Sequence, residues 1–144
     1  IKTIKKGKTT YFTDKKRTTG KTYYYKLRPY KTVKNKKQYM DYSSVVSTKA
    51  VPGRVKFTKL TAKNQKATLK WKKVSGASGY LLYRSDRRDG GFTCINSVSS
   101  RKTSYTNTKL KKGQTYYYRI RAYRKVGGKR VYGNFSVVKA VKAK

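Results

Sequence analysis

The stretch 113–123, Gly-Gln-Thr-Tyr-Tyr-Tyr-Arg-Ile-Arg-Ala-Tyr, has a near copy at 20–30, Gly-Lys-Thr-Tyr-Tyr-Tyr-Lys-Leu-Arg-Pro-Tyr, at an offset of 93 residues. In each copy a glycine leads into aromatic and branched residues that alternate with cations. This alternation is typical of a half-buried β-strand, because successive side chains point to opposite faces of a sheet. A motif that recurs at the length of a small domain predicts tandem domains of one kind. A chain of 144 residues is too short for two such units, so one of them is incomplete.

Alternating runs between turn signals predict strands along the whole chain, and no segment has apolar residues at helical spacing for three turns. Before a turn at Pro52-Gly53, we expect strands at the ranges 1–4, 8–13, 22–33 and 39–48, with a hairpin loop at 34–37. After that turn, we expect strands at the ranges 55–60, 67–72, 79–85, 92–98, 103–106, 115–126 and 131–141. The sequence therefore predicts an all-β fold with a seven-stranded sandwich in its second part.

Three motifs in this order resemble the fibronectin type III family. They are Trp71 in the second strand of the sandwich, Tyr-Leu-Leu-Tyr-Arg at 80–84, and Leu-Lys-Lys-Gly-Gln-Thr-Tyr-Tyr-Tyr-Arg-Ile-Arg-Ala at 110–122. The resemblance implies an immunoglobulin-like β-sandwich with the tryptophan in the core between the sheets. It also implies that Tyr116 forms a tyrosine corner, and that three following residues face the core: Tyr118, Ile120 and Ala122.

By the same resemblance, residues 52–144 form a complete domain and residues 1–51 match only the second half of one, strands C′ to G. Half a sandwich leaves a sheet face and strand edges uncovered, which is costly. We therefore expect the missing strands A to C to come from upstream sequence or from another chain.

The segment Lys-Trp-Lys-Lys-Val-Ser-Gly-Ala-Ser-Gly-Tyr at 70–80 resembles the lysine- and tyrosine-rich tandem domains of Gram-positive bacterial surface proteins. This resemblance implies an extracellular protein, at the cell surface or secreted. The only cysteine, Cys94, rules out a disulfide within the chain, so packing must hold the fold. The longest apolar run is far shorter than the ~18 residues that a membrane-spanning helix needs, so we expect no membrane span.

The chain carries 40 Lys and Arg against 4 Asp and Glu, a net charge of +36. Such a charge attracts polyanions from a distance. Five cations are expected at outward strand positions and are the candidate polyanion-binding residues: Lys70, Lys72, Arg84, Arg119 and Arg121. Tyr117 and Tyr123 are the candidate exposed aromatics, which could stack on bases or sugars. The alternative for these tyrosines is a structural role in the sheet, covered by lysine stems.

The sequence gives little support for catalysis or for a cofactor. The chain has no histidine, which excludes Ser-His and Cys-His nucleophile systems and, with one cysteine, a zinc shell. Asp86 and Asp89 are close enough in sequence to be considered as a glycosidase pair. We expect them instead to cap a turn and to pair with Arg87 and Arg88, and we predict no enzyme activity, cofactor or metal.

The function predicted from these observations is a non-catalytic spacer or adhesion module of a larger bacterial surface or secreted protein. Its basic faces would associate with anionic wall polymers or glycans. Two alternatives stay open: a non-specific binder of nucleic acid or another polyanion, and a module that binds a specific host protein.

Overall fold

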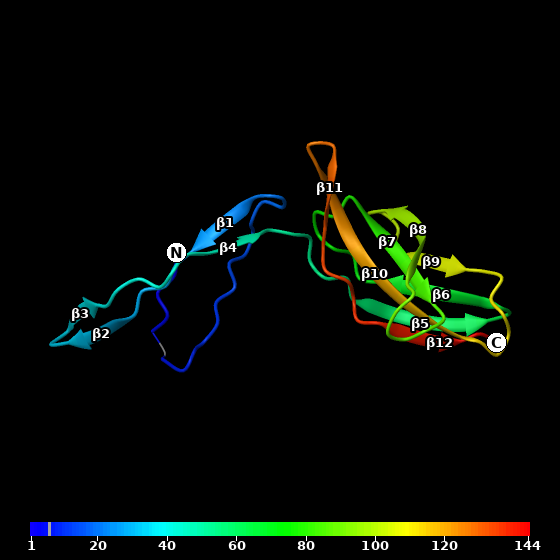
Figure 1. Cartoon of the computed structure of the whole chain (residues 1–144), viewed down its shortest axis with the longest axis horizontal. Coiled ribbons are helices and arrows are strands. Elements are labelled where there is room, and N and C mark those ends of the chain that lie inside the picture. The colour runs from blue at the N-terminus through cyan, green and yellow to red at the C-terminus, as the bar shows by residue number, and fades with distance from the viewer. Residues whose placement is uncertain (6) are drawn as a thin grey trace.

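The computed structural model describes residues 1–5 and 7–144 and contains only β-strands, turns and irregular segments there. Figure 1 shows two parts, an extended N-terminal arm (residues 1–50) and a compact sandwich (residues 51–144). The strands of the arm are β1 (Thr22–Tyr25), β2 (Tyr30–Val33), β3 (Lys36–Tyr39) and β4 (Val46–Lys49). The strands of the sandwich are β5 (Phe57–Lys63), β6 (Lys66–Trp71), β7 (Gly79–Ser85), β8 (Thr93–Ser99), β9 (Ser104–Asn107), β10 (Thr115–Val126), β11 (Lys129–Tyr132) and β12 (Lys139–Lys142). The all-β prediction is confirmed.

The sandwich consists of two antiparallel sheets. One sheet has the order β5-β6-β9, and the other has the order β11-β10-β7-β8 with β12 also paired to β10. Strand β10 is the centre of the second sheet, because it pairs with β7 along one edge and with two strands along the other edge. On that second edge β12 pairs with the start of β10 and β11 pairs with its end. The strand expected at 131–141 is thus split into β11 and β12, since the segment between them leaves the regular ladder.

The core between the sheets follows from the alternation in the sequence. Trp71 packs edge-on against Tyr80, with ring centroids 5.5 Å apart. Every second residue of β10 points inward, as the family resemblance implied. Burying a large apolar side chain stabilises a fold by roughly 1.5–3 kcal/mol, so these side chains dominate the stability of the sandwich. The buried core residues are Val55, Ala67, Leu69, Trp71, Tyr80, Leu82, Leu110, Tyr116, Tyr118, Ile120, Ala122 and Ala143.

A tyrosine corner fixes the entry to β10, as expected. The Tyr116 hydroxyl accepts a hydrogen bond from the backbone N–H of Lys111 at 3.1 Å. Gly113, between them, has φ of +83°, a left-handed conformation that a residue with a Cβ rarely adopts. The corner therefore combines a buried ring, a satisfied hydroxyl and a glycine turn.

The arm differs from the strand pattern expected for it. Residues 1–4 and 8–13 form no strand, and the single strand expected at 22–33 is two strands, β1 and β2. Strand β1 pairs with β4 and β2 pairs with β3, as two separate two-stranded ladders. Similar bonds to a serine hydroxyl and to irregular backbone also occur beside the unbroken β10, but there β7 pairs along the other edge. The break arises because no third strand among the described residues lies beside the chain between β1 and β2. The hairpin turn is as expected, with Lys34 and Asn35 at φ of +46° and +58°.

The part of the chain that the structure describes contains no helix long and apolar enough to cross a membrane.

Candidate functional site

The outer face of the five-stranded sheet carries two arginines stacked between aromatic rings. The guanidinium carbon of Arg119 lies 3.9 Å from the ring centroid of Phe135 and 4.3 Å from that of Phe92. That of Arg121 lies 4.1 Å from the Tyr132 centroid and 4.8 Å from the Phe135 centroid. We call this set the arginine–aromatic ladder, and its members are Tyr83, Phe92, Arg119, Arg121, Tyr132 and Phe135.

The irregular segment between β11 and β12 builds the ladder. The N–H groups of Gly133 and Ser136 donate to the carbonyls of Ala122 and Ile120, at 2.9 and 2.8 Å. The Ser136 hydroxyl accepts the N–H of Ile120 at 3.1 Å. A side-chain oxygen thus replaces one backbone acceptor along β10, and the detour places Phe135 over the arginines (edge-on to Tyr83, centroids 5.1 Å apart).

The ladder limits what these arginines can bind. Both side chains are half-buried. Their Nε atoms are buried and have no hydrogen-bond partner among the described residues. One terminal nitrogen of Arg121 donates to the Tyr83 hydroxyl at 2.9 Å. A guanidinium whose faces lie against rings cannot offer its planar fork freely to a phosphate. The main role of the ladder is therefore to stabilise the sheet, and its contribution to the positive surface potential is secondary.

Lys70 and Lys72 lie on the opposite sheet of the sandwich. Ala67, Leu69 and Trp71 point into the core, so Lys70 points outward, and both lysines are exposed. The structure therefore does not bring the five candidate cations together into one site. It places two lysines on one face and two arginines on the other.

Arg84 is a correction to the sequence-based prediction. It pairs with Tyr118 across the sheet and so faces inward, whereas we expected it outward. Its terminal nitrogen donates to Asn107 Oδ1 at 3.1 Å, and the same oxygen accepts the hydroxyl of Tyr118 at 3.0 Å. The guanidinium also lies 5.1 Å from the Tyr116 ring centroid. Burial raises the pKa of Tyr118 to about 12, the nearby Arg84 charge acting against this.

Tyr123 is a second correction, because the candidate exposed ring is only 7% exposed. It lies over Gly79, where the Cβ of any larger residue would come within 2.6 Å of the Tyr123 hydroxyl. Tyr132 and the Arg130 guanidinium cover it, at 6.5 and 4.6 Å from its ring centroid. Tyr117 is half-buried, so neither ring is a free stacking platform.

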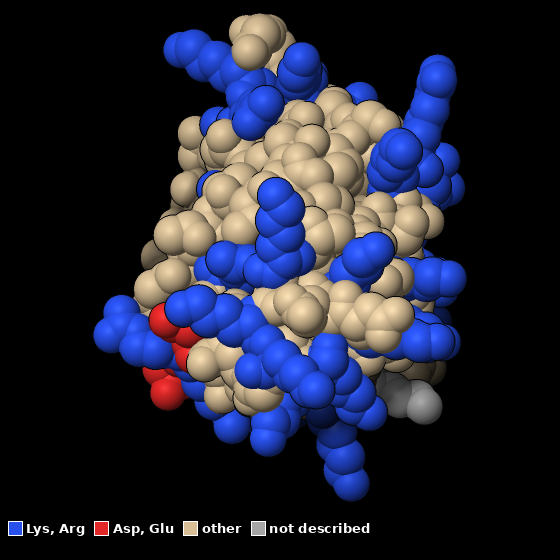
Figure 2. Space-filling view, turned by 90° about the vertical axis from the view of Figure 1, so that its right-hand side faces the viewer, with Lys and Arg blue, Asp and Glu red and all other residues tan. Residues whose placement is uncertain are grey.

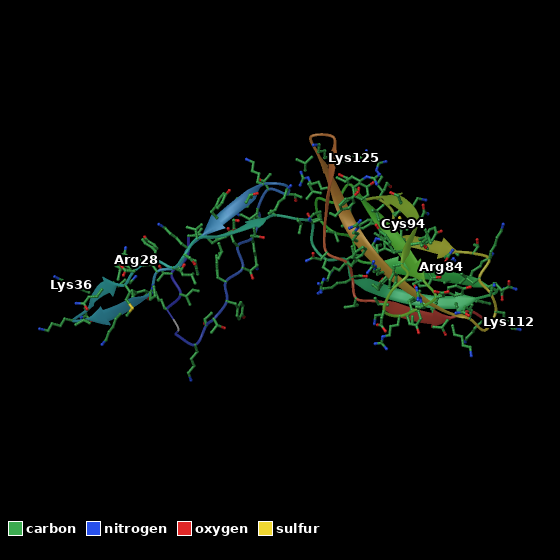
Figure 3. All side chains as sticks on the ribbon, in the orientation of Figure 1. Arg28, Lys36, Arg84, Cys94, Lys112 and Lys125 are labelled. Atoms are coloured by element: carbon green, nitrogen blue, oxygen red, sulfur yellow. The ribbon has the colours of Figure 1, made fainter. Side chains whose placement is uncertain are left out.

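Most other cations are spread over the whole chain. Figure 3 places Arg28 and Lys36 in the arm, Arg84 in the sandwich, and Lys125 and Lys112 at its two ends. Figure 2 shows blue side chains scattered around one end of the molecule with a single small acidic spot. Among the described residues one ion pair forms, between Arg17 and Asp14 in the arm, at 3.2 Å.

The turn between β7 and β8 differs from its expected form. Ser85, and not an aspartate, holds it: its hydroxyl donates to the Gly90 carbonyl and accepts the N–H of Arg87. Asp86 and Asp89 are exposed and form no ion pair with Arg87 or Arg88 in the described chain. No group of three or more His, Cys, Asp or Glu in the described residues could hold a metal ion.

Sequence reasoning missed the ladder because two of its rings lie outside the regular strands. In the sequence, Phe135 stands out only as part of a formal glycosylation sequon. A usable signal is nevertheless present, because Tyr-Gly-Asn-Phe-Ser at 132–136 repeats Tyr-Met-Asp-Tyr-Ser at 39–43 at the same offset of 93 residues.

Comparison with known proteins agrees with this geometry. Residues 50–137 match the family model described as the fibronectin type III domain. The structure is similar to that of a Fn3-like protein from Clostridium thermocellum, with a TM-score of 0.53 and 26% identity, covering 66% of this chain and 93% of that one. The FN1–FN3 domains of chicken CNTN1 align over 92% of this chain and 46% of theirs, with a TM-score of 0.57 and 15% identity, a likeness of fold alone.

One curated relative shares sequence with the chain. It is a Kelch domain-containing protein of Saccharolobus solfataricus, 40% identical over 73 residues. The match spans half of this chain and only a tenth of that protein.

Proposed function

Because the chain belongs to the fibronectin type III family, whose domains are commonly modules of larger proteins, we propose that it is a non-catalytic spacer or adhesion module. It would act outside a bacterial cell, at the surface or secreted, and hold a partner domain near anionic polymers such as wall teichoic acids or acidic glycans. The elongated arrangement of arm and sandwich suits a spacer (Figure 1).

The observation that carries the polymer-binding part is the lack of compensation for the positive charge. With 40 cations against 4 carboxylates, and one ion pair among the described residues, the protein's own carboxylates neutralise almost none of it. At physiological ionic strength the field of each exposed charge decays over about 8 Å. A flexible polyanion lying along the surface would remain within that distance of several cations at once.

The distribution of cations favours diffuse attraction over a defined pocket. Exposed lysines dominate, and a lysine ammonium acts as a compact point charge, whereas the two best-placed arginines are stacked in the ladder. Binding of this kind releases counterions, so affinity should fall steeply with salt. It should also depend little on the chemical identity of the polymer.

The test is a salt titration of binding to purified teichoic acid and to a sulfated glycan. We expect the logarithm of affinity to fall linearly with the logarithm of salt concentration. The double variant Lys70→Gln/Lys72→Gln should bind several-fold more weakly with a shallower slope. The matched variant Lys70→Arg/Lys72→Arg keeps the charge and should bind like the parent chain.

Two results would contradict the proposal. Affinity that does not fall as salt rises would remove the electrostatic mechanism and favour a specific host-protein module. Nucleic-acid binding with a sequence preference that survives excess competitor polyanion would favour a nucleic-acid binder.

A further inference from the structure

Hydrogen bonds in the arm repeat those in the sandwich at the constant offset of 93 residues. Thr18 donates its N–H to the Tyr23 hydroxyl at 3.0 Å, as Lys111 does to Tyr116 at 3.1 Å. The turn residue between them is again a glycine in the left-handed region, Gly20, with φ of +92°. The arm therefore contains its own tyrosine corner.

The detour that carries the ladder is repeated as well. In the arm, Leu27 donates its N–H to the Ser43 hydroxyl at 2.9 Å, and Ser43 donates its own N–H to the Leu27 carbonyl at 2.8 Å. The corresponding distances between Ile120 and Ser136 are 3.1 and 2.8 Å.

The stacking contacts of the ladder have counterparts too. The Lys26 ammonium lies 3.8 Å from the Tyr42 ring centroid, where Arg119 lies 3.9 Å from Phe135. The strand pairs of the arm have the same register as those of the sandwich. Thr22 pairs with Lys49 in β1 and β4, as Thr115 pairs with Lys142 in β10 and β12. Tyr30 pairs with Tyr39 in β2 and β3, as Tyr123 pairs with Tyr132 in β10 and β11.

The correspondence extends upstream of the corner. The Tyr25 hydroxyl donates to Asp14 Oδ2 at 3.0 Å, as that of Tyr118 does to Asn107 Oδ1. The bonds and strand pairs of the arm thus repeat those between positions 107 and 142 at one constant offset, although the equivalents of β8 and β9 form no strand among the described residues. What the arm lacks is a counterpart of the range 51–93, which contains β5, β6 and β7.

The consequence is visible in the exposure of equivalent residues. Leu27 is 72% exposed, whereas its equivalent Ile120 is fully buried against β7. Tyr25 is half-buried, whereas Tyr118 is fully buried. The local bonds of the arm are therefore formed while its inner face is open.

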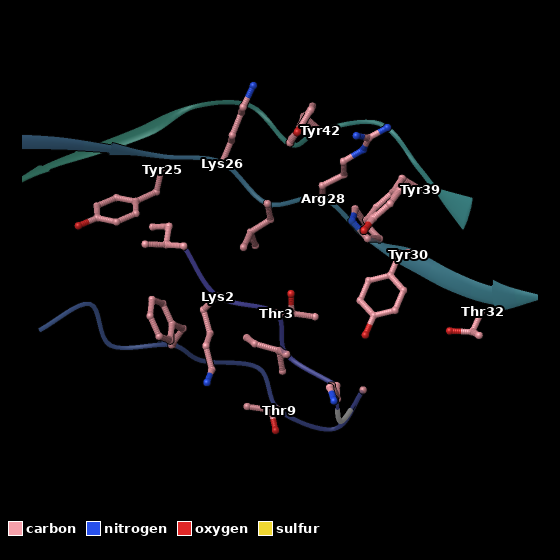
Figure 4. A pocket seen from close by; sticks show the side chains of 17 residues that line it. Lys2, Thr3, Thr9, Tyr25, Lys26, Arg28, Tyr30, Thr32, Tyr39 and Tyr42 are labelled. Carbon is pink, nitrogen blue, oxygen red and sulfur yellow. The ribbon is translucent and has the colours of Figure 1, made fainter. Parts of the chain in front are cut away.

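A hollow of about 1110 Å³ lies where the missing strand would be. It is lined on one side by residues 1–5, the equivalents of β8, and on the other by residues 25–30, the equivalents of the middle of β10. In the sandwich β7 pairs with both β8 and β10 and fills this position. Figure 4 shows the two segments facing each other, with Tyr30 pointing into the space and Lys26 pointing away from it.

We propose that the inner face of the arm is a docking surface for a three-stranded segment built like residues 51–93, joined directly ahead of Ile1. The occupant needs a strand like β7 to fill the hollow and a tryptophan strand like β6 to cover Leu27. The direct connection follows from the register, because Thr93 and Cys94 are consecutive within β8 and Ile1 is the equivalent of Cys94. This inference stands apart from polymer binding.

The test adds a second copy of residues 51–93 ahead of Ile1 in the full chain and measures amide hydrogen exchange by NMR. We expect the amides of Tyr25 and Leu27 to exchange about 100-fold more slowly than in the parent chain, approaching the protection of Tyr118 and Ile120. In the parent chain these amides should exchange fast although the N–H of Leu27 is bonded to Ser43, because a two-stranded ladder with an uncovered inner face opens readily.

Two variants of the extended chain serve as controls. Leu27→Lys places a charge on the inner face, so it should abolish the added protection in the arm and leave the protection of Ile120 unchanged. Lys26→Gln changes a neighbouring outward side chain and should keep the added protection.

Unchanged exchange of Leu27 in the extended chain would overturn the proposal. Protection of Leu27 in the parent chain that rises with protein concentration would also overturn the proposal. A second copy of the chain, and not a segment joined to the arm, would then be the occupant.

Discussion

Replacing Ser136 by alanine tests whether the irregular segment between β11 and β12 is an integral part of the sandwich. The Ser136 hydroxyl is the acceptor for the N–H of Ile120, a residue with no solvent exposure. Alanine at this position leaves that donor buried and unsatisfied. Water cannot replace the lost oxygen without opening the contact between the segment and β10.

The magnitude follows from the unsatisfied donor. An intact hydrogen bond contributes about 1 kcal/mol net, whereas removing its acceptor and leaving the buried donor unsatisfied costs about 1–3 kcal/mol. We therefore expect Ser136→Ala to lower the free energy of unfolding by about 2 kcal/mol. For a sandwich of this size that corresponds to a fall in Tm of roughly 8–16 °C.

The assay is urea denaturation followed by the fluorescence of the single tryptophan, which reports the sandwich core, and by circular dichroism, which also reports the strands of the arm. Ser43→Ala is the matched control, because Ser43 accepts the equivalent N–H of Leu27, which is largely exposed to water. It should change the free energy of unfolding by less than about 0.5 kcal/mol. A loss below ~0.5 kcal/mol for Ser136→Ala, or equal losses for both variants, would refute the reasoning.

Two further predictions concern the sandwich. Burial raises the pKa of Tyr118 from its usual 10.0 to about 12, so the folded state holds the hydroxyl proton more tightly than the unfolded state. The stabilisation that comes from the protonated Tyr118 is therefore complete below pH 10 and is lost as the pH rises toward 12. Between pH 9 and pH 11, the free energy of unfolding measured by urea denaturation should therefore fall less for Tyr118→Phe than for the parent chain. Equal falls in the two proteins would contradict the raised pKa. Gly79→Ala should destabilise the sandwich by about 1–3 kcal/mol in the same assay, because its Cβ would lie 2.5 Å from the Val98 carbonyl oxygen. Gly90→Ala meets no atom within 4 Å and should change stability by less than about 0.5 kcal/mol, so similar losses in both variants would argue against the close packing.

The sequence predicted the parts of the fold that depend on alternation. Trp71 and the inward residues of β10 were correctly placed by the family resemblance, and the alternation agrees with it, because a strand with one buried face has a period of two. Arg84 was misplaced because it continues the inward register of Tyr80 and Leu82 at the end of the sandwich, where a guanidinium can reach a polar partner. Its charge suggested an outward position, whereas the register decided otherwise.

The outer face could not be predicted in the same way. Tyr123 does occupy an outward position of β10, but burial there depends on side chains from other segments, in particular Arg130 and Tyr132. A glycine in the neighbouring strand, Gly79, makes the room for its ring. Alternation within one strand carries no information about such contacts between segments.

The short ladder between β12 and β10 has a mechanical consequence for a module in a tandem array. The two strands pair over four residues, from Thr115↔Lys142 to Tyr118↔Lys139, and β12 runs along the long axis of the molecule (Figure 1). Tension transmitted along the array therefore pulls these hydrogen bonds in shear, so that they share the load and do not open one after another. Beyond β12, the next resistance is the stacking of Phe135 on Arg119 and Arg121, which ties the same length of chain to the middle of β10. The arginine–aromatic ladder thus acts as a second clamp behind the first, and the rate of forced unfolding depends on both.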